Sequence, residues 1–189
     1  IAMIVFTAYS GYKGIDYYSL YFYKILLYSK EEASLLTANL SYLRPISAVL
    51  AGIIADRISS RKTSIFLFLF LMISYSSLTF LSSEDSIIIF LFLNFIISLV
   101  AIFSLRGIFY SLLKETNIPV SITGISVGII SLVGYMPDIF IGPIFGFFLE
   151  AENTLYGFKK CFIFLLIISL LGYIFSMLLP KPNIKRKLK

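Results

Sequence analysis

Long apolar segments alternate with short polar ones along the whole chain. A run of about 18 or more apolar residues can cross a hydrocarbon layer of roughly 30 Å, because a helix rises about 1.5 Å per residue. These runs are apolar on all sides, without the alternation that a strand of a membrane β-barrel requires. The sequence therefore predicts an all-α membrane protein with six transmembrane helices, at about 1–27, 34–55, 63–82, 87–112, 120–149 and 160–180.

The composition favours a lipid environment. The chain is 59% hydrophobic and 14% charged, with a mean hydropathy of +0.94, whereas about a quarter of the residues of an ordinary globular domain are charged. So few polar residues would not cover the surface of a soluble globular protein. No signal peptide is recognisable after Ile1, and we expect the chain to be a piece of a longer protein.

Positive charge is concentrated in alternate connections. One set of connections holds nine lysines and arginines and the other set holds three. The basic set comprises 56–62, 113–119 and the tail 181–189, and the other set comprises 28–33, 83–86 and 150–160. Because cytoplasmic loops carry the excess of basic residues, both chain ends and the basic tail are predicted to be cytoplasmic. This topology explains the net charge of +6, so nucleic-acid binding is not expected.

The turn between the second and third predicted spans reads GIIADRISSRKT. A basic turn fixes orientation in any membrane protein, but here Gly52 would also allow close helix approach, and Asp56 could face the positive N-terminus of another helix. The turn resembles the loop signature of the major facilitator superfamily (MFS) of secondary transporters, Gly-x-x-x-Asp-Arg-x-Gly-x-Arg-Lys. The matching residues are Gly52, Asp56, Arg57, Arg61 and Lys62, with Ser59 in place of the second glycine.

Two further motifs follow in the order of that family. Arg106-Gly107 resembles the arginine-bearing motif of its fourth helix, and Gly142-Pro143-x-x-Gly146 is similar to the glycine-proline motif of its fifth. The resemblance covers the whole chain and implies one half of a twelve-helix transporter, the carboxy-terminal six-helix half. It further implies a missing amino-terminal half and alternating access around a central site. The cytoplasmic turn would act as a latch, that is, its helix-end and ion-pair contacts would hold one of the two conformations.

Six ionisable residues fall inside the predicted spans. Each costs roughly 2.5–3.5 kcal/mol by insertion scales, so such residues usually face the bundle interior or a water-filled path. They are Lys13, Asp16, Lys24, Arg44, Arg106 and Asp138. Lys24 is expected to reach the outer interface. Four cations against two anions favour an anionic organic solute, provided that the missing half adds no compensating acids.

Two of these cations have alternative partners. Lys13 and Asp16 form an i, i+3 pair, which is either a buried structural pair or a substrate-facing pair that opens during transport. Arg44 precedes Pro45, which should bend the second span. A guanidinium suits a carboxylate, phosphate or sulfonate group of a solute, and the alternative is a structural pairing with Asp16 or Asp138.

The fifth span places a carboxylate between two prolines. Asp138 lies between Pro137 and Pro143, and broken helices often carry transporter sites. The carboxylate is either proton-coupling or a fixed counter-ion. Arg106, near the cytoplasmic end of the fourth span, is predicted to pair with Glu115. The predicted substrate or proton pathway consists of Lys13, Asp16, Arg44 and Asp138.

Enzymatic motifs are incomplete. The GISVG of 124–128 matches the nucleophile pattern of α/β-hydrolases, but the chain has no histidine and no strand is predicted before the serine. A lone Cys161 forms no internal disulfide and no cysteine metal cluster, so neither a metal nor a cofactor is predicted. Small-residue spacing instead predicts helix packing by Gly124, Gly128, Gly142, Pro143 and Gly146.

Two classes of function stay open. The first is secondary active transport of a small solute, an organic anion being one candidate, in the inner membrane. The second is a non-transporting membrane module, such as a sensor, an assembly partner or an inert fragment. A membrane enzyme is disfavoured, because the sequence offers no nucleophile-base pair or metal set.

Overall fold

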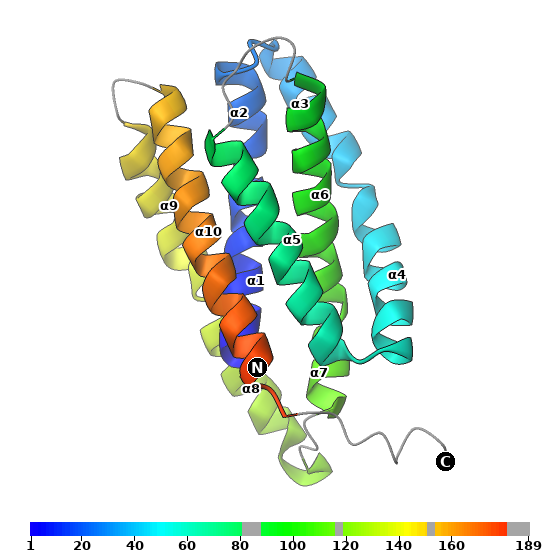
Figure 1. Ribbon diagram of the computed structural model, residues 1–189. Coiled ribbons are helices and arrows are strands. Elements are labelled where there is room, and N and C mark those ends of the chain that lie inside the picture. The colour runs from blue at the N-terminus through cyan, green and yellow to red at the C-terminus, as the bar shows by residue number, and fades with distance from the viewer. Residues whose placement is uncertain (81–87, 116–118, 151–153, 181–189) are drawn as a thin grey trace.

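The computed structural model describes residues 1–80, 88–115, 119–150 and 154–180, and the regular elements of these ranges are all helices, without a strand (Figure 1). The predicted basic tail at 181–189 lies outside the described residues. The helices are α1 (Ala2–Ile15), α2 (Tyr18–Lys24), α3 (Lys30–Leu40), α4 (Leu43–Arg57), α5 (Ser60–Phe80), α6 (Ile88–Gly107), α7 (Phe109–Glu115), the 3-10 turn η2 (Val120–Ile122), α8 (Thr123–Gly134), α9 (Pro137–Leu149) and α10 (Thr154–Leu178).

Five helical segments of the described chain are long and apolar enough to cross a membrane, which confirms the prediction of an all-helical membrane protein. They are Lys30–Arg57, Ser60–Phe80, Ile88–Gly107, Thr123–Leu149 and Thr154–Leu178. They correspond to the second to sixth predicted spans. The first predicted span is divided into α1 and α2, which follow one another along the same direction of the bundle (Figure 1).

The segments run up and down the bundle in chain order. Figure 1 shows the N-terminus, the turn between α4 and α5, α7 and the end of α10 at one end of the molecule, and α2 and the start of α3 at the other. The basic residues Arg57, Arg61, Lys62 and Lys114 therefore gather at the end that carries the N-terminus. This is the arrangement that the charge pattern of the connections predicts.

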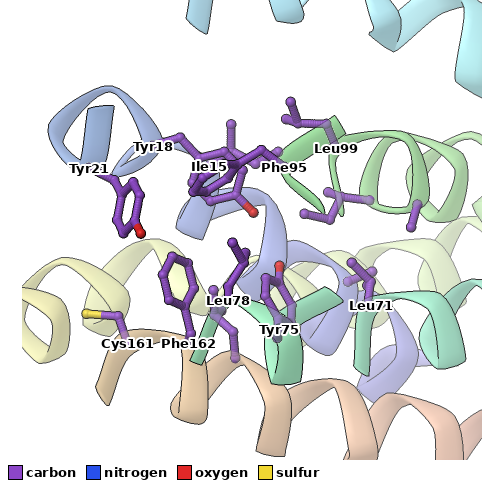
Figure 2. Close-up of a cluster of buried hydrophobic side chains, with 14 of the residues drawn as sticks. Ile15, Tyr18, Tyr21, Leu71, Tyr75, Leu78, Phe95, Leu99, Cys161 and Phe162 are labelled. Atoms are coloured by element: carbon purple, nitrogen blue, oxygen red, sulfur yellow. The ribbon is translucent and has the colours of Figure 1, made fainter. Parts of the chain in front are cut away.

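An aromatic cluster fills the bundle between α2, α5, α6 and α10. Figure 2 shows Tyr18, Tyr21, Tyr75, Phe95 and Phe162 gathered in this cluster, and all five are buried. The rings of Tyr18 and Phe95 meet edge to face with centroids 4.6 Å apart, a preferred geometry for aromatic pairs. The Tyr18 and Ser98 hydroxyls are hydrogen-bonded at 2.8 Å. Shape and polar pairing thus fix the position of α2 beside the core.

The glycines expected to pack helices do not do so within the described bundle. A Cβ atom built on Gly124, Gly128 or Gly146 would meet no atom within 4 Å, and one on Gly142 would meet only the Tyr17 hydroxyl, at 3.9 Å. Pro143 is exposed inside α9. The prediction is wrong for this bundle, because Gly124 and Gly128 lie on the exposed face of α8 and neither Gly142 nor Gly146 provides a close approach between helices.

Other glycines provide the close approaches. A Cβ on Gly107 would lie 2.8 Å from the Ala48 Cα, where α6 crosses α4. A Cβ on Gly172 would overlap the Phe68 ring and lie 2.6 Å from the Thr7 hydroxyl, where α10 meets α5 and α1. Small residues at such crossings let helix backbones approach closely in membranes.

Gly172→Ala is expected to lower the free energy of unfolding by about 1–3 kcal/mol, because the added methyl group overpacks a closed crossing. Gly124→Ala is the matched control and should be neutral or slightly stabilising, since its methyl group enters open space. Thermal unfolding followed by reaction of the buried Cys161 thiol with a maleimide dye measures both. Equal effects of the two substitutions would contradict the packing described here.

Candidate functional site

Charged and aromatic side chains converge on one face of α1, and we call this set the polar cluster. It comprises Tyr9, Tyr12, Lys13 and Asp16 of the α1 segment, Arg44 of α4, Arg106 of α6, Tyr135 after α8 and Asp138 of α9. These residues are exposed or half-buried, although the surrounding helices are strongly apolar. The structure thus brings together all four predicted pathway residues.

Lys13 forms ion pairs with both carboxylates of the polar cluster. Its Nζ lies 2.9 Å from Asp16 Oδ2 and 3.2 Å from Asp138 Oδ1. The Tyr9 hydroxyl donates a hydrogen bond of 2.8 Å to the other oxygen of Asp138. The predicted i, i+3 pair of Lys13 and Asp16 is confirmed, but it is not buried, because the two side chains are 29% and 56% exposed.

The two arginines contact aromatic rings. Arg44 Nη2 donates a hydrogen bond of 2.6 Å to the Tyr12 hydroxyl, and the Arg44 Cζ lies 5.3 Å from the centre of the Phe103 ring. The Arg106 Cζ lies 3.9 Å above the Tyr12 ring and 5.3 Å from the Tyr9 ring. Neither guanidinium forms an ion pair with a carboxylate of the described residues. The alternative pairing of Arg44 with an aspartate is therefore wrong.

Three interrupted helices meet at the polar cluster. The second span breaks between α3 and α4, next to the predicted bend at Pro45, and the fifth breaks between α8 and α9. The first breaks between α1 and α2, where Tyr17 donates a hydrogen bond of 3.4 Å to the Gly142 carbonyl of α9. Lys13 lies in the last turn of α1 and Asp138 in the first turn of α9. Both charges are favoured by the helix dipoles at these positions.

Glu115 caps α5 and does not pair with Arg106 as predicted. Its carboxylate accepts hydrogen bonds from the Ser60 amide at 2.8 Å, the Ser60 hydroxyl at 3.0 Å and the Arg61 amide at 3.3 Å. The chain turns at Ile108 between α6 and α7, so α7 directs Glu115 toward the start of α5. A carboxylate at a helix N-terminus satisfies amides that have no partner within the helix.

The predicted latch turn also contacts α10. Arg61 donates a hydrogen bond of 2.7 Å from Nη2 to the Met177 carbonyl, at the end of that helix. Ser59, which replaces the second glycine of the loop signature, accepts a hydrogen bond of 3.2 Å from the Lys62 amide and so acts as the N-cap of α5. The turn therefore joins the ends of α5, α7 and α10.

The rest of the turn lies on α4. Asp56 and Arg57 are exposed in its last turn, and a Cβ atom added to Gly52 would meet no heavy atom within 4 Å, so the predicted role of this glycine in close helix approach is wrong here. Ala51 and Ala55 are buried on the opposite side of that helix. The two alanines provide the small packing surface of α4.

Sequence reasoning missed the aromatic members of the polar cluster. Tyr9 and Tyr12 are two of 13 tyrosines, and nothing in their local sequence distinguishes them from tyrosines at the membrane interface. The available signal was their helical spacing to Lys13 and Asp16, which places Tyr9, Tyr12 and the charged pair on neighbouring turns of one face.

Comparison with known proteins finds similarity to the inner membrane protein YihN of Escherichia coli (strain K12). The two are 26% identical over 194 residues, which cover 99% of this chain and 45% of YihN. The chain thus spans less than half the length of this relative. No family model matches the chain, and no solved structure matches it.

Proposed function

We propose that this chain belongs to a secondary active transporter of the inner membrane that moves a small organic anion by alternating access. The observation that carries the proposal is the polar cluster, in which three cations and two carboxylates meet on one face of an apolar bundle. The net charge of these five groups is +1, from three positive and two negative side chains.

The exposure of the cluster favours a water-filled path. Asp16 and Asp138 side chains are 56% and 48% exposed, and carboxylates in contact with lipid would be costly. Interrupted helices that direct their ends at one point are also typical of transporter sites.

Several observations support assignment to one half of an MFS-type transporter. α1 and α2 together would provide a sixth crossing, and the turn of 52–62 lies in its expected place after the second crossing. A second half would account for the remaining length of a protein such as YihN. It would also close the exposed side of the polar cluster and cover the outward glycines of α8. In this arrangement both ends of the chain are cytoplasmic.

The test is uptake into proteoliposomes that contain the full-length protein. A panel of organic anions, cations and neutral solutes is offered with and without a proton gradient. We expect uptake of at least one organic anion above the level of empty liposomes. No uptake of any anion, or uptake confined to cations, would contradict the proposal.

Asp56→Asn is expected to lower the maximal rate of uptake and leave the affinity for the solute unchanged. The residue lies at the end of the bundle and belongs to the turn that would latch one conformation, far along α4 from Arg44. Initial rates and equilibrium binding separate the two effects. Glu31→Gln, at the other end of the bundle, is the control and should change neither. Weakened solute binding with an unchanged maximal rate of uptake would contradict the proposed role of Asp56 in holding one conformation.

A non-transporting membrane module is the second candidate. The ion pair of Lys13 with Asp138 and the hydrogen bond from Tyr17 to Gly142 tie α1 to α9, as a static assembly would require. The uptake experiment separates the two functions, because a static module binds or signals without moving solute.

A further inference from the structure

A pocket of about 250 Å³ adjoins the polar cluster between α1, α6, α7 and the end of α8. Its walls include aliphatic and aromatic side chains, among them Ile4, Ala8, Leu105 and Phe109. Arg106 and the rings of Tyr9 and Tyr135 lie where the pocket meets the cluster. The pocket therefore combines aliphatic and aromatic side chains with tyrosine hydroxyls and a single cationic group.

Arg106 is available to bind an anion. Its guanidinium lies over the Tyr12 ring, and a guanidinium that stacks on a ring keeps its N–H donors directed outward in its own plane. No acceptor for these donors is found among the described residues. The nearby carboxylates are already occupied, Asp138 by Tyr9 and Lys13, and Asp16 by Lys13.

The size and shape of the pocket indicate the body of the ligand. A cavity of about 150 Å³ is enough to hold benzene, so about 250 Å³ accommodates one six-membered ring with small substituents. The Tyr9 and Tyr135 rings meet edge to face, with centroids 4.7 Å apart, and offer aromatic surface to such a ring.

We propose that this pocket binds a single-ring aromatic carboxylate or sulfonate, with the ring against Ile4, Ala8 and Tyr135 and the anionic group on Arg106. The inference rests on the proposed function, because it names the substrate class of the same site.

The first experiment is calorimetric titration of the full-length protein in lipid nanodiscs. Benzoate and benzenesulfonate are compared with acetate and methanesulfonate, which keep the anionic group without the ring, and with benzyl alcohol, which keeps the ring without the charge. Benzoate and benzenesulfonate should bind at least about tenfold more tightly than the two aliphatic anions and than benzyl alcohol. Equal affinity of benzoate and acetate would overturn the inference.

Two variants test the two halves of the pocket. Arg106→Gln should weaken benzoate binding by about tenfold or more, whereas Lys160→Gln, which removes a cation over the Tyr156 ring at the other end of the bundle, should leave it unchanged. Ala8→Leu should fill the pocket and weaken benzoate but not acetate. Unchanged benzoate affinity in folded Arg106→Gln protein would overturn the inference.

A series of ligands on the unmodified protein avoids any effect of substitution on folding. Affinity should fall from benzoate to 2-naphthoate to 9-anthroate, and a rise along this series would overturn the inference. Uptake of aliphatic anions without benzoate binding would overturn the pocket assignment and leave the transport function standing. Benzoate binding without uptake of any solute would support the pocket and overturn transport.

Discussion

Lys13→Met is expected to destabilise the protein by about 1–3 kcal/mol and to abolish uptake. Lys13 is the shared partner of Asp16 and Asp138, so its removal leaves two carboxylates close together without the cation that contacts both. Unpaired charges at membrane depth are costly, and the partial exposure of both side chains keeps the effect below that of a fully buried pair. Thermal unfolding, followed by the reaction of the buried Cys161 thiol with a maleimide dye, measures the change in stability.

Charge compensation provides the control for this prediction. Asp138→Asn alone leaves Lys13 with Asp16 and should fold nearly as well as the unmodified protein. The double variant Lys13→Met/Asp138→Asn should be more stable than Lys13→Met, because one of the two unpaired carboxylates is gone. The coupling energy of the pair is the effect of the double variant minus the sum of the two single effects. Additive effects of the two substitutions would contradict the ion pair as a stabilising contact.

Arg44→Ala is expected to reduce uptake to about a tenth or less while the protein still folds. Arg44 contacts Tyr12 and Phe103 and pairs with no carboxylate of the described residues. Its removal therefore leaves no carboxylate without an ion-pair partner. A charge-assisted hydrogen bond to a solute contributes about 1.5–3 kcal/mol, which corresponds to roughly ten- to a hundredfold in binding.

The comparison for Arg44 uses matched amounts of protein in the membrane. Arg44→Lys keeps the charge but not the planar fork, and it should retain part of the uptake. Near-normal uptake by folded Arg44→Ala would remove the residue from the solute site.

The sequence predicts the long helices well, because their apolar runs have few interruptions. The spans around α5, α6 and α10 are found with ends that differ by a few residues. The break between α1 and α2 is missed because no proline marks it. In the second and fifth spans, Pro45 and Pro137 signal the interruptions, and both are present in the structure.

Charges inside apolar spans identify most of the candidate site, but their partners depend on tertiary structure. Lys13 pairs with Asp16 as its spacing predicts, whereas its second partner, Asp138, comes from α9, far along the chain. The partner predicted for Arg106 is wrong, because the turn at Ile108 directs Glu115 toward α5. Spacing along one helix also does not show which face is covered, and for that reason it predicts packing by Gly124 and Gly128 although they face outward.

The central claim is that the polar cluster faces water while lying among membrane-spanning helices. Cysteine labelling tests it in a Cys161→Ser background, with a charged, membrane-impermeant thiosulfonate reagent. Asp16→Cys should react readily, because the Asp16 side chain is 56% exposed in the polar cluster and Lys13 keeps Asp138 as a partner. Ile73→Cys, on the outer face of α5 where the isoleucine is 65% exposed, should stay unreactive because lipid covers it. Reaction at both positions, or at position 73 alone, would contradict the account.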